Sequence, residues 1–179
     1  CFLVFLNAFN MFDGINLQSS FYSIIIFSFI SFLLIDSYLI KILLVFLGCY
    51  SFLNYKNKSF LGDSGSLLMA FLIGYIFIKL YNLEQIKFTD EVFIFMMIPG
   101  IDLIRVFFKR IFNKKNPLRP DRSHLHHLLS LKFSHIASLT IIQLLVVTPI
   151  ILSFLDINRL FVILTSVFIY IIIIYKLEK

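Results

Sequence analysis

The chain has 179 residues, of which 60% are hydrophobic and only 15% are charged, and its formal net charge is +6. Average soluble domains are about 45–50% apolar and about 25% charged, so this composition excludes an ordinary soluble domain and predicts an integral membrane protein. The positive charge does not indicate nucleic acid as a partner, because the basic residues cluster at the ends of apolar runs, as expected next to a lipid bilayer.

Apolar runs of about 17–25 residues are long enough to cross a bilayer as helices. The sequence predicts a truncated first helix at 1–9 and six full spans at about 19–35, 37–54, 64–81, 91–109, 136–154 and 159–176. No alternating strand pattern occurs, so the predicted fold is all-α, a polytopic transmembrane helical bundle that forms one domain over 1–179. Because Cys1 already lies in an apolar run, we expect the chain to be the C-terminal part of a longer protein.

The connections between the predicted spans differ in charge. By parity, segments 10–18, 55–63, 110–135 and the C-terminal KLEK fall on one side, and they carry most of the lysines and arginines. Segments 35–38, 82–90 and 155–158 fall on the other side, where Lys87 stands among acidic residues. The positive-inside rule therefore predicts that the first set, with an Arg/His loop at 110–135, lies in the cytoplasm.

Three segments on that side carry unusual polar residues. The first is NAFNMFDGIN, in which Asn7, Asn10 and Asp13 recur every three residues and Gly14 is expected to end the helix. Carboxylate and amide oxygens suit a hard divalent cation, or the polar edge of a sugar or base. A helix end with solvated amides is the alternative interpretation.

The second segment is FLGDSGS, where Gly62 and Gly65 flank Asp63 and Ser64 directly before a span. Asp63 or Ser64 can simply cap the helix that follows. A helix N-terminus also binds phosphate, and a neighbouring carboxylate can hold Mg²⁺ for a diphosphate. Both interpretations stay open from this segment alone.

The third segment, RPDRSHLHH, gathers two arginines and three histidines: Arg119, Arg122, His124, His126 and His127. Arginine binds phosphate through two parallel hydrogen bonds, and histidine can donate to phosphate or carry a proton near neutral pH. Zinc is the competing interpretation, but no cysteine or second carboxylate cluster supports it. The neighbouring lysines alone are typical of contacts with anionic lipid.

Within the span at 91–109, Asp102 and Arg105 stand three residues apart after Pro99-Gly100. They form either a self-neutralising pair or a site in which the carboxylate turns toward a cavity shared with the other polar segments. Taken together, the segments predict phosphoryl transfer from a nucleotide donor to a membrane-resident acceptor, with magnesium at the donor phosphates.

The motifs NAFNMFDGIN, GDSGS, PGIDLIRVFFKR and RPDRSHLHHLL, in this order, resemble the polyprenyl-phosphate N-acetylhexosamine-1-phosphate transferases, the MraY/WecA-like enzymes of glycosyltransferase family 4. The resemblance covers essentially the whole chain, as the C-terminal part of a family member. It implies transfer of N-acetylhexosamine-1-phosphate, with GlcNAc-1-phosphate favoured, from a UDP-sugar to polyprenyl (undecaprenyl) phosphate, with release of UMP. Mg²⁺ is the implied cofactor, and Mn²⁺ is its substitute.

The resemblance also implies a cellular setting. The protein would be an integral protein of the bacterial inner (plasma) membrane with its active site on the cytoplasmic face. It would catalyse the first membrane step in the synthesis of a cell-surface glycan of the O-antigen or teichoic acid type. The implied partners are a UDP-N-acetylhexosamine, polyprenyl phosphate and the lipid bilayer, and a homodimer is the candidate assembly.

From the residues and the resemblance together we expect three groups of site residues. Catalytic roles are expected for Asp13 and Asp63 and for the histidines His124, His126 and His127. Metal binding is expected for Asn10 and Asp63. Substrate binding is expected for Asn7, Asn16, Gly62, Ser64, Arg119 and Arg122, with Asn16 at the uracil. Asp102 matches a family aspartate to which we assign no role.

Two departures from the family pattern stand out. The family usually has glycine directly after the position of Asn16, whereas this chain has Leu17. The adjacent aspartate pair of the family is absent from these 179 residues, so we expect them to be inactive alone.

Three alternatives remain. One is a phospho-N-acetylmuramoyl-pentapeptide transferase, although HLHH differs from the three consecutive histidines of that branch. A membrane transporter and a degenerate gene product are the alternatives from other classes.

Overall fold

The computed structural model describes residues 2–34, 37–116, 122–155 and 157–179, and every regular element in them is a helix. In chain order the helices are α1 Phe2–Phe12, α2 Gln18–Leu33, α3 Tyr38–Tyr55, α4 Gly62–Asn82, α5 Thr89–Phe112, α6 Leu125–Lys132, α7 His135–Phe154 and α8 Arg159–Glu178. The predicted all-α fold is confirmed over these residues. Each span predicted from hydropathy begins and ends within three residues of an observed helix.

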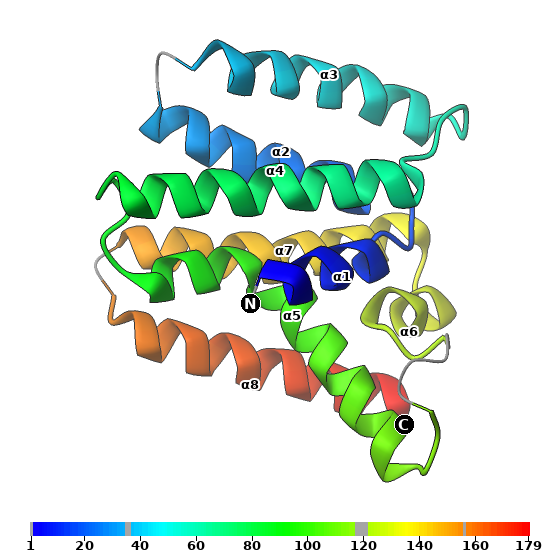
Figure 1. Ribbon diagram of the computed structural model, residues 1–179. Helices are drawn as coiled ribbons and strands as arrows, with labels where there is room; N and C mark the ends of the chain where they lie inside the picture. Colours follow the sequence, from blue (N-terminus) through cyan, green and yellow to red (C-terminus); the bar gives the residue numbers. More distant parts are fainter. Residues whose placement is uncertain (1, 35–36, 117–121, 156) are drawn as a thin grey trace.

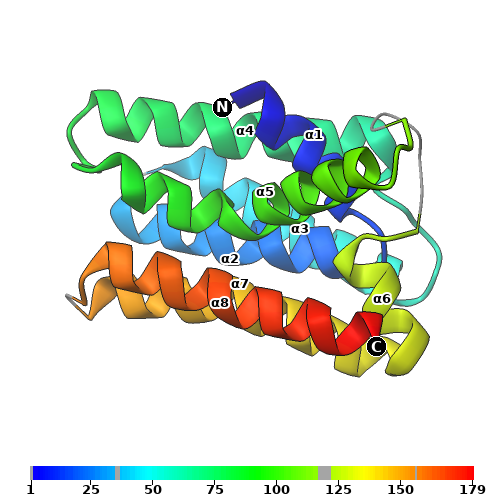
Figure 2. The same cartoon turned by 90° about the horizontal axis from the view of Figure 1, so that it is seen from below.

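The long helices lie side by side, and their ends gather at two opposite ends of the bundle (Figure 1). One end holds the C-terminal ends of α1, α3 and α8, the starts of α2, α4 and α7, and the short helix α6. A view turned by 90° shows the same division (Figure 2). We call this the polar end, because it contains the described parts of the three polar segments, 10–17, 56–63 and 122–132.

Four of the described helices are long and apolar enough to cross a bilayer: α3, α4, α7 and α8. Helix α2 is apolar but has only 16 residues. Helix α5 has 24 residues, but its second half contains charged side chains, including Asp102, Arg105 and Lys109. The structure is therefore that of a polytopic helical membrane protein, in which α2 and α5 depart from a plain apolar span.

An aromatic cluster joins α1 to α2 beneath the polar end. The rings of Phe9 and Phe12 lie 5.3 and 5.6 Å from the ring of Tyr22, both in edge-on geometry. Aromatic pairs in this geometry add about 0.5–1.5 kcal/mol beyond the burial of their surface. At the start of α1, Phe2 lies against Gly74 of α4, where a Cβ atom would stand 2.2 Å from the Phe2 ring. The small residue allows α1 and α4 to approach closely.

Helix α5 continues through Pro99, which has no backbone N–H to donate to the carbonyl of Phe95. The hydroxyl of Tyr22 donates a hydrogen bond to that carbonyl instead. Tyr22 is fully buried. Its contact from α2 therefore gives the Phe95 carbonyl, which the proline leaves unpaired, a donor inside the bundle. The two halves of α5 run in different directions in Figure 1, and the second half crosses the C-terminal end of α8.

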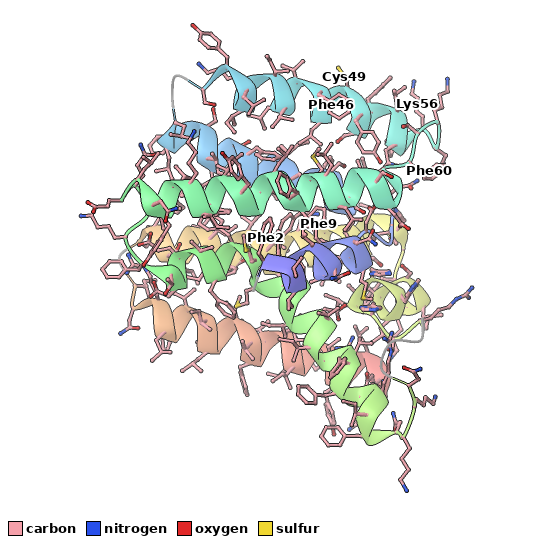
Figure 3. The ribbon with its side chains drawn as sticks, in the orientation of Figure 1. Phe2, Phe9, Phe46, Cys49, Lys56 and Phe60 are labelled. Carbon is pink, nitrogen blue, oxygen red and sulfur yellow. The ribbon has the colours of Figure 1, made fainter. Side chains whose placement is uncertain are left out.

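The outward faces of the helices are strongly apolar. Helix α3 exposes Leu39, Ile42, Val45, Phe46, Phe52 and Leu53, and helix α8 exposes Leu160, Phe161, Leu164, Phe168 and Ile171. Figure 3 shows Cys49 of α3 on the side that faces away from the bundle. Apolar surfaces this extensive are costly in water and are expected against hydrocarbon chains.

Candidate active site

The polar end contains a cavity of about 300 Å³. It lies between the turn after α1, the C-terminal part of α3 and the start of α4, so it joins the first two polar segments predicted from the sequence. The polar lining side chains are Asn10, Asp13, Asn16, Tyr50, Asn54 and Asp63, and the remaining lining residues include Gly14, Phe60, Leu61 and Gly62.

Asp13 stands directly after the last residue of α1, where the helix gives way to an irregular turn. Its carboxylate accepts a hydrogen bond from the Ser19 hydroxyl. Burial raises the pKa of Asp13 above its ordinary value, and the nearby negative charge of Asp63 raises it further, while the Ser19 hydrogen bond acts in the opposite direction. Two carboxylates thus face one cavity, and their like charges repel each other.

Asn10 and Asp63 approach the cavity from α1 and α4. The Oδ1 atom of Asn10 accepts a hydrogen bond of 2.5 Å from the hydroxyl of Ser66, one turn into α4. Gly62 begins α4 with a φ of +64°, a conformation that glycine adopts without steric cost. That turn presents Asp63 on the exposed first turn of α4.

The donor set fits a hard cation. Two carboxylates and an amide oxygen are the ligand types that Mg²⁺ prefers, and phosphate oxygens of a substrate usually complete its six-coordinate shell. Within the described residues no group of three or more His, Cys, Asp and Glu side chains converges in a way that could hold a metal ion. A cation at Asn10, Asp13 and Asp63 would therefore depend on oxygens brought by the substrate.

Asn54 of α3 holds the two walls of the cavity together, although no motif in the sequence singles it out. Its side-chain oxygen accepts a hydrogen bond of 2.7 Å from the backbone N–H of Leu17, and its Nδ2 donates to the carbonyl of Ser59 at 2.7 Å. A second bridge runs from the Asn16 amide to Asn57 at 2.5 Å. In the sequence Asn54 looks like an ordinary polar residue at the end of a span.

The third polar segment reaches the cavity through Gly14. A Cβ atom on Gly14 would stand 2.0 Å from Nε2 of His126, so the imidazole ring lies directly against the glycine. The ring of His126 also contacts that of His127, with centroids 4.1 Å apart. Burial lowers the pKa of His126 to about 3, with the neighbouring His127 acting in the same direction. His126 is therefore a neutral ring at physiological pH.

Several predicted site residues lie outside the cavity lining. Asn7 is exposed and donates back to the carbonyl of Leu3 at 2.9 Å. Ser64 and Arg122 are also exposed, and Arg119 lies outside the described residues. Asp102 was one candidate for a carboxylate turned toward the shared cavity, and that expectation is wrong: the carboxylate is 3% exposed and faces α6 and α8, because His124 and Tyr170 bind it there.

Comparison with known proteins relates the chain to one family of enzymes. Residues 1–81 match the family described as Glycosyl transferase family 4. An undecaprenyl-phosphate alpha-N-acetylglucosaminyl 1-phosphate transferase of Yersinia pestis is 31% identical over 140 residues, which cover 69% of this chain and 37% of the relative. A probable undecaprenyl-phosphate N-acetylglucosaminyl 1-phosphate transferase of Bacillus subtilis (strain 168) is 30% identical over 148 residues, or 78% of this chain and 41% of the relative.

A Haemophilus influenzae relative with the same name as the Yersinia pestis protein is 35% identical over 75 residues, which cover 41% of this chain and 21% of that protein. The chain thus spans between about a fifth and two fifths of the curated relatives that it matches. No solved structure gives a significant match. The family match includes the turn of Asp13 and Gly14 and the Gly62-Asp63 start of α4, which are two walls of the cavity. Together with the relatives, it shows that this chain belongs to glycosyl transferase family 4.

Proposed function

We propose that the protein transfers N-acetylglucosamine-1-phosphate from UDP-N-acetylglucosamine to undecaprenyl phosphate and releases UMP. The observation that carries the proposal is the cavity at the polar end of the helical bundle, which Asn10, Asp13 and Asp63 all line. The names of the Yersinia pestis and Bacillus subtilis relatives support both the sugar phosphate and the lipid acceptor.

We place the donor's uridine at the part of this cavity that Asn16 and Phe60 line. Asn16 offers an amide, which can both donate to and accept from the edge of uracil. Phe60 lines the same cavity with a ring that is 68% exposed, and it lies at the polar end in Figure 3. Stacking of a base on an aromatic ring contributes about 1–3 kcal/mol.

The diphosphate then extends toward Asp13 and Asp63. Asn10 and Asp63, with Asp13 beside them, would hold Mg²⁺, which would supply positive charge against the phosphate charge that the two carboxylates otherwise repel. An oxygen of the lipid phosphate attacks the β-phosphorus, the bond from that phosphorus to the bridging oxygen breaks, and UMP leaves with the electron pair. The lipid phosphate is already an anion at neutral pH, so the protein's task is to position the two phosphates and stabilise their charge.

A groove between α5 and α8 supports a lipid acceptor. It has a volume of about 600 Å³ and is lined by the apolar side chains Phe108, Phe112, Ile171, Ile174 and Tyr175. Arg105 and Lys109 line the same groove together with Glu178, which pairs with them at 3.4 and 2.7 Å, so a phosphate head group there would compete with that carboxylate for the two cations. In contrast, a transporter usually binds its substrate near the middle of the membrane, whereas this cavity lies at one end of the bundle.

The test is release of UMP by membranes from cells that express the full coding sequence containing these residues. UDP-N-acetylglucosamine and Mg²⁺ are supplied with and without undecaprenyl phosphate, and release is expected only with the lipid. Asp63→Ala should abolish release while the protein still inserts in the membrane. The control is Glu84→Ala, which removes an exposed carboxylate at the opposite end and should leave release unchanged.

Other donors decide how far the proposal holds. Release with UDP-N-acetylmuramoyl-pentapeptide but not with UDP-N-acetylglucosamine would keep the reaction and replace the sugar. Lipid-dependent release that survives Asp63→Ala would remove Asp63 from the mechanism. No release with any UDP-N-acetylhexosamine would overturn the proposal.

A further inference from the structure

We propose that Asp102 is a positioning residue, which docks the first turn of α6 on the membrane helices and thereby holds His126 against Gly14 of the cavity. The role in turnover rests on the proposed function, whereas the docking itself does not. The sequence resemblance left Asp102 without a role, and the cavity lining does not include it.

Three consecutive residues before and at the start of α6 are bound to α5. Ser123 accepts a hydrogen bond of 2.6 Å at its carbonyl from Arg105. His124 donates from Nδ1 to Asp102 at 2.8 Å, and the backbone N–H of Leu125 donates to both oxygens of the same carboxylate at 3.1 and 3.3 Å. Three successive contacts of this kind fix the backbone at this point and leave little freedom for α6 to rotate.

The carboxylate of Asp102 acts as the N-terminal cap of α6. His124 occupies the cap position, but its own side chain makes no capping hydrogen bond. The first N–H groups of a helix need acceptors, and the helix dipole favours a negative charge at this end. Asp102 meets both requirements from another helix. A cap supplied by a tertiary contact makes the position of α6 depend on α5.

Asp102 is itself held on its other side. Tyr170 of α8 donates its hydroxyl to Oδ1 at 2.6 Å, and Arg105 donates from Nη2 to the same oxygen at 2.8 Å. Arg105 also donates from Nε to the Tyr170 hydroxyl at 2.7 Å. The buried charge is thus paired and hydrogen-bonded from α5, α6 and α8, which is the condition under which a buried carboxylate is tolerated.

The histidines carry this position to the cavity. The carboxylate accepts from Nδ1 of His124, so in the neutral ring Nε2 has no proton and acts as an acceptor. The His124 ring lies parallel to that of His126, with centroids 5.9 Å apart, and His126 lies against Gly14. At the far end of α6, Lys132 donates to the carbonyl of Lys176 at 2.9 Å. Helix α6 is therefore held at both ends, with His126 directed at the Asp13 turn.

The docking is tested by hydrogen exchange on the full-length protein in detergent, followed over residues 123–130. Asp102→Asn keeps the side-chain volume but removes the charge, and its amide cannot accept from both His124 and Arg105. We expect amide exchange in this segment to accelerate about tenfold or more, while exchange in α7 stays unchanged. Tyr170→Phe, which removes one donor only, should have a smaller effect in the same direction. The matched control is Glu91→Gln at the other end of α5, whose carboxylate pairs with Arg159 at 2.6 Å.

Turnover provides the second measurement. Residues that orient metal ligands without touching the metal typically cost about 10–100-fold in activity when they are changed, and we expect a similar range for Asp102. Asp102→Asn is expected to lower kcat within that range and to change KM for the UDP-sugar less than threefold, because the uridine part of the cavity makes no contact with Asp102. Glu91→Gln should leave both constants unchanged.

Unchanged exchange over residues 123–130 in folded Asp102→Asn would overturn the docking. Faster exchange with unchanged kcat would overturn the link to the cavity. If the wild-type protein releases no UMP, the proposed function fails, while the exchange experiment still decides the docking. If Asp102→Asn does not fold, Tyr170→Phe decides it, and unchanged exchange in that variant counts against the proposal.

Discussion

At the scale of single residues, Leu17 adopts a conformation that few side chains tolerate. Its φ is +69°, and the position is the one at which the family pattern usually has glycine. The left-handed conformation costs a residue with a Cβ atom roughly 1–2 kcal/mol. The hydrogen bond from Leu17 to Asn54 and the burial of the leucine side chain, which is 8% exposed, hold the turn in place. The turn therefore survives the loss of the glycine.

This strain predicts an inverted order of stability for two variants. Leu17→Gly loses the buried side chain but relieves the strain, whereas Leu17→Ala loses most of the side chain and keeps the strain. Leu17→Gly should therefore be the more stable of the two by about 1 kcal/mol in thermal unfolding in detergent. At Leu80, a buried residue inside α4, alanine should be the more stable variant, as is usual in a helix. The same order at both positions would refute the strain at Leu17.

Gly14 and His126 should behave as a coupled pair. Gly14→Ala places a methyl group within 2.0 Å of the imidazole, so it should destabilise the protein by about 1–3 kcal/mol, as overpacked sites do. In a His126→Ala background the ring is gone and the cost of Gly14→Ala should fall. Unfolding of the four proteins of this cycle measures the coupling, for which about 0.5–3 kcal/mol is typical of residues in contact. Additive effects would show that the two residues do not touch.

Asp13 is predicted to favour function over stability. Burial raises its pKa, so the folded state disfavours the charged form at neutral pH. As the pH falls from 7 through this raised pKa, the penalty disappears and the protein should become more stable in this range. Asp13→Asn should remove that pH dependence and raise the unfolding temperature at pH 7, while release of UMP falls to background. A lower unfolding temperature at pH 7 would show that the Asp13 charge is stabilising.

At the scale of helices, α5 depends on a contact that its own sequence does not reveal. Tyr22→Phe removes the hydroxyl that donates to the Phe95 carbonyl. Pro99 has no N–H to replace it, so among the described contacts this carbonyl would lose its donor. An unpaired buried acceptor costs about 1–3 kcal/mol, so the unfolding free energy should fall by that amount. Tyr55→Phe, which changes an exposed tyrosine of α3, is the control and should have no effect. Equal effects of the two variants would argue against the contact.

The helices themselves were largely predictable, because hydrophobic length is a local property of the sequence. The spans at 64–81 and 136–154 correspond to α4 and α7 almost residue for residue. The partners of polar groups were not predictable, because they come from distant parts of the chain. Asp102 and Leu125 are 23 residues apart, and Leu17 and Asn54 are 37 apart. Motif residues therefore indicated two walls of the cavity, but not the residues that hold them together.

At the scale of the whole molecule, charge distinguishes the two ends of the bundle. The polar end carries Lys56, Lys58, Arg110, Lys114, Lys115, Arg122, Lys132, Lys176 and Lys179 among the described residues, while Lys41, Lys79, Lys87 and Arg159 lie toward the opposite end. Arg159 pairs with Glu91 and so contributes little net charge. Positive residues are retained on the cytoplasmic side during insertion, and a nucleotide-sugar donor would be met on that same side.

This asymmetry predicts the orientation of the bundle in the membrane. In a full-length protein with Cys1→Ser and Cys49→Ser, a single cysteine is introduced at Gln85 between α4 and α5, or at Lys58 between α3 and α4; both positions are exposed. A maleimide that cannot cross membranes should label Gln85→Cys on intact spheroplasts and Lys58→Cys only after permeabilisation. The reverse result would place the cavity outside the cell, where the proposed donor is not made. These two positions fix the orientation of α4, and because the connections alternate between the two ends, they also fix that of the other long helices.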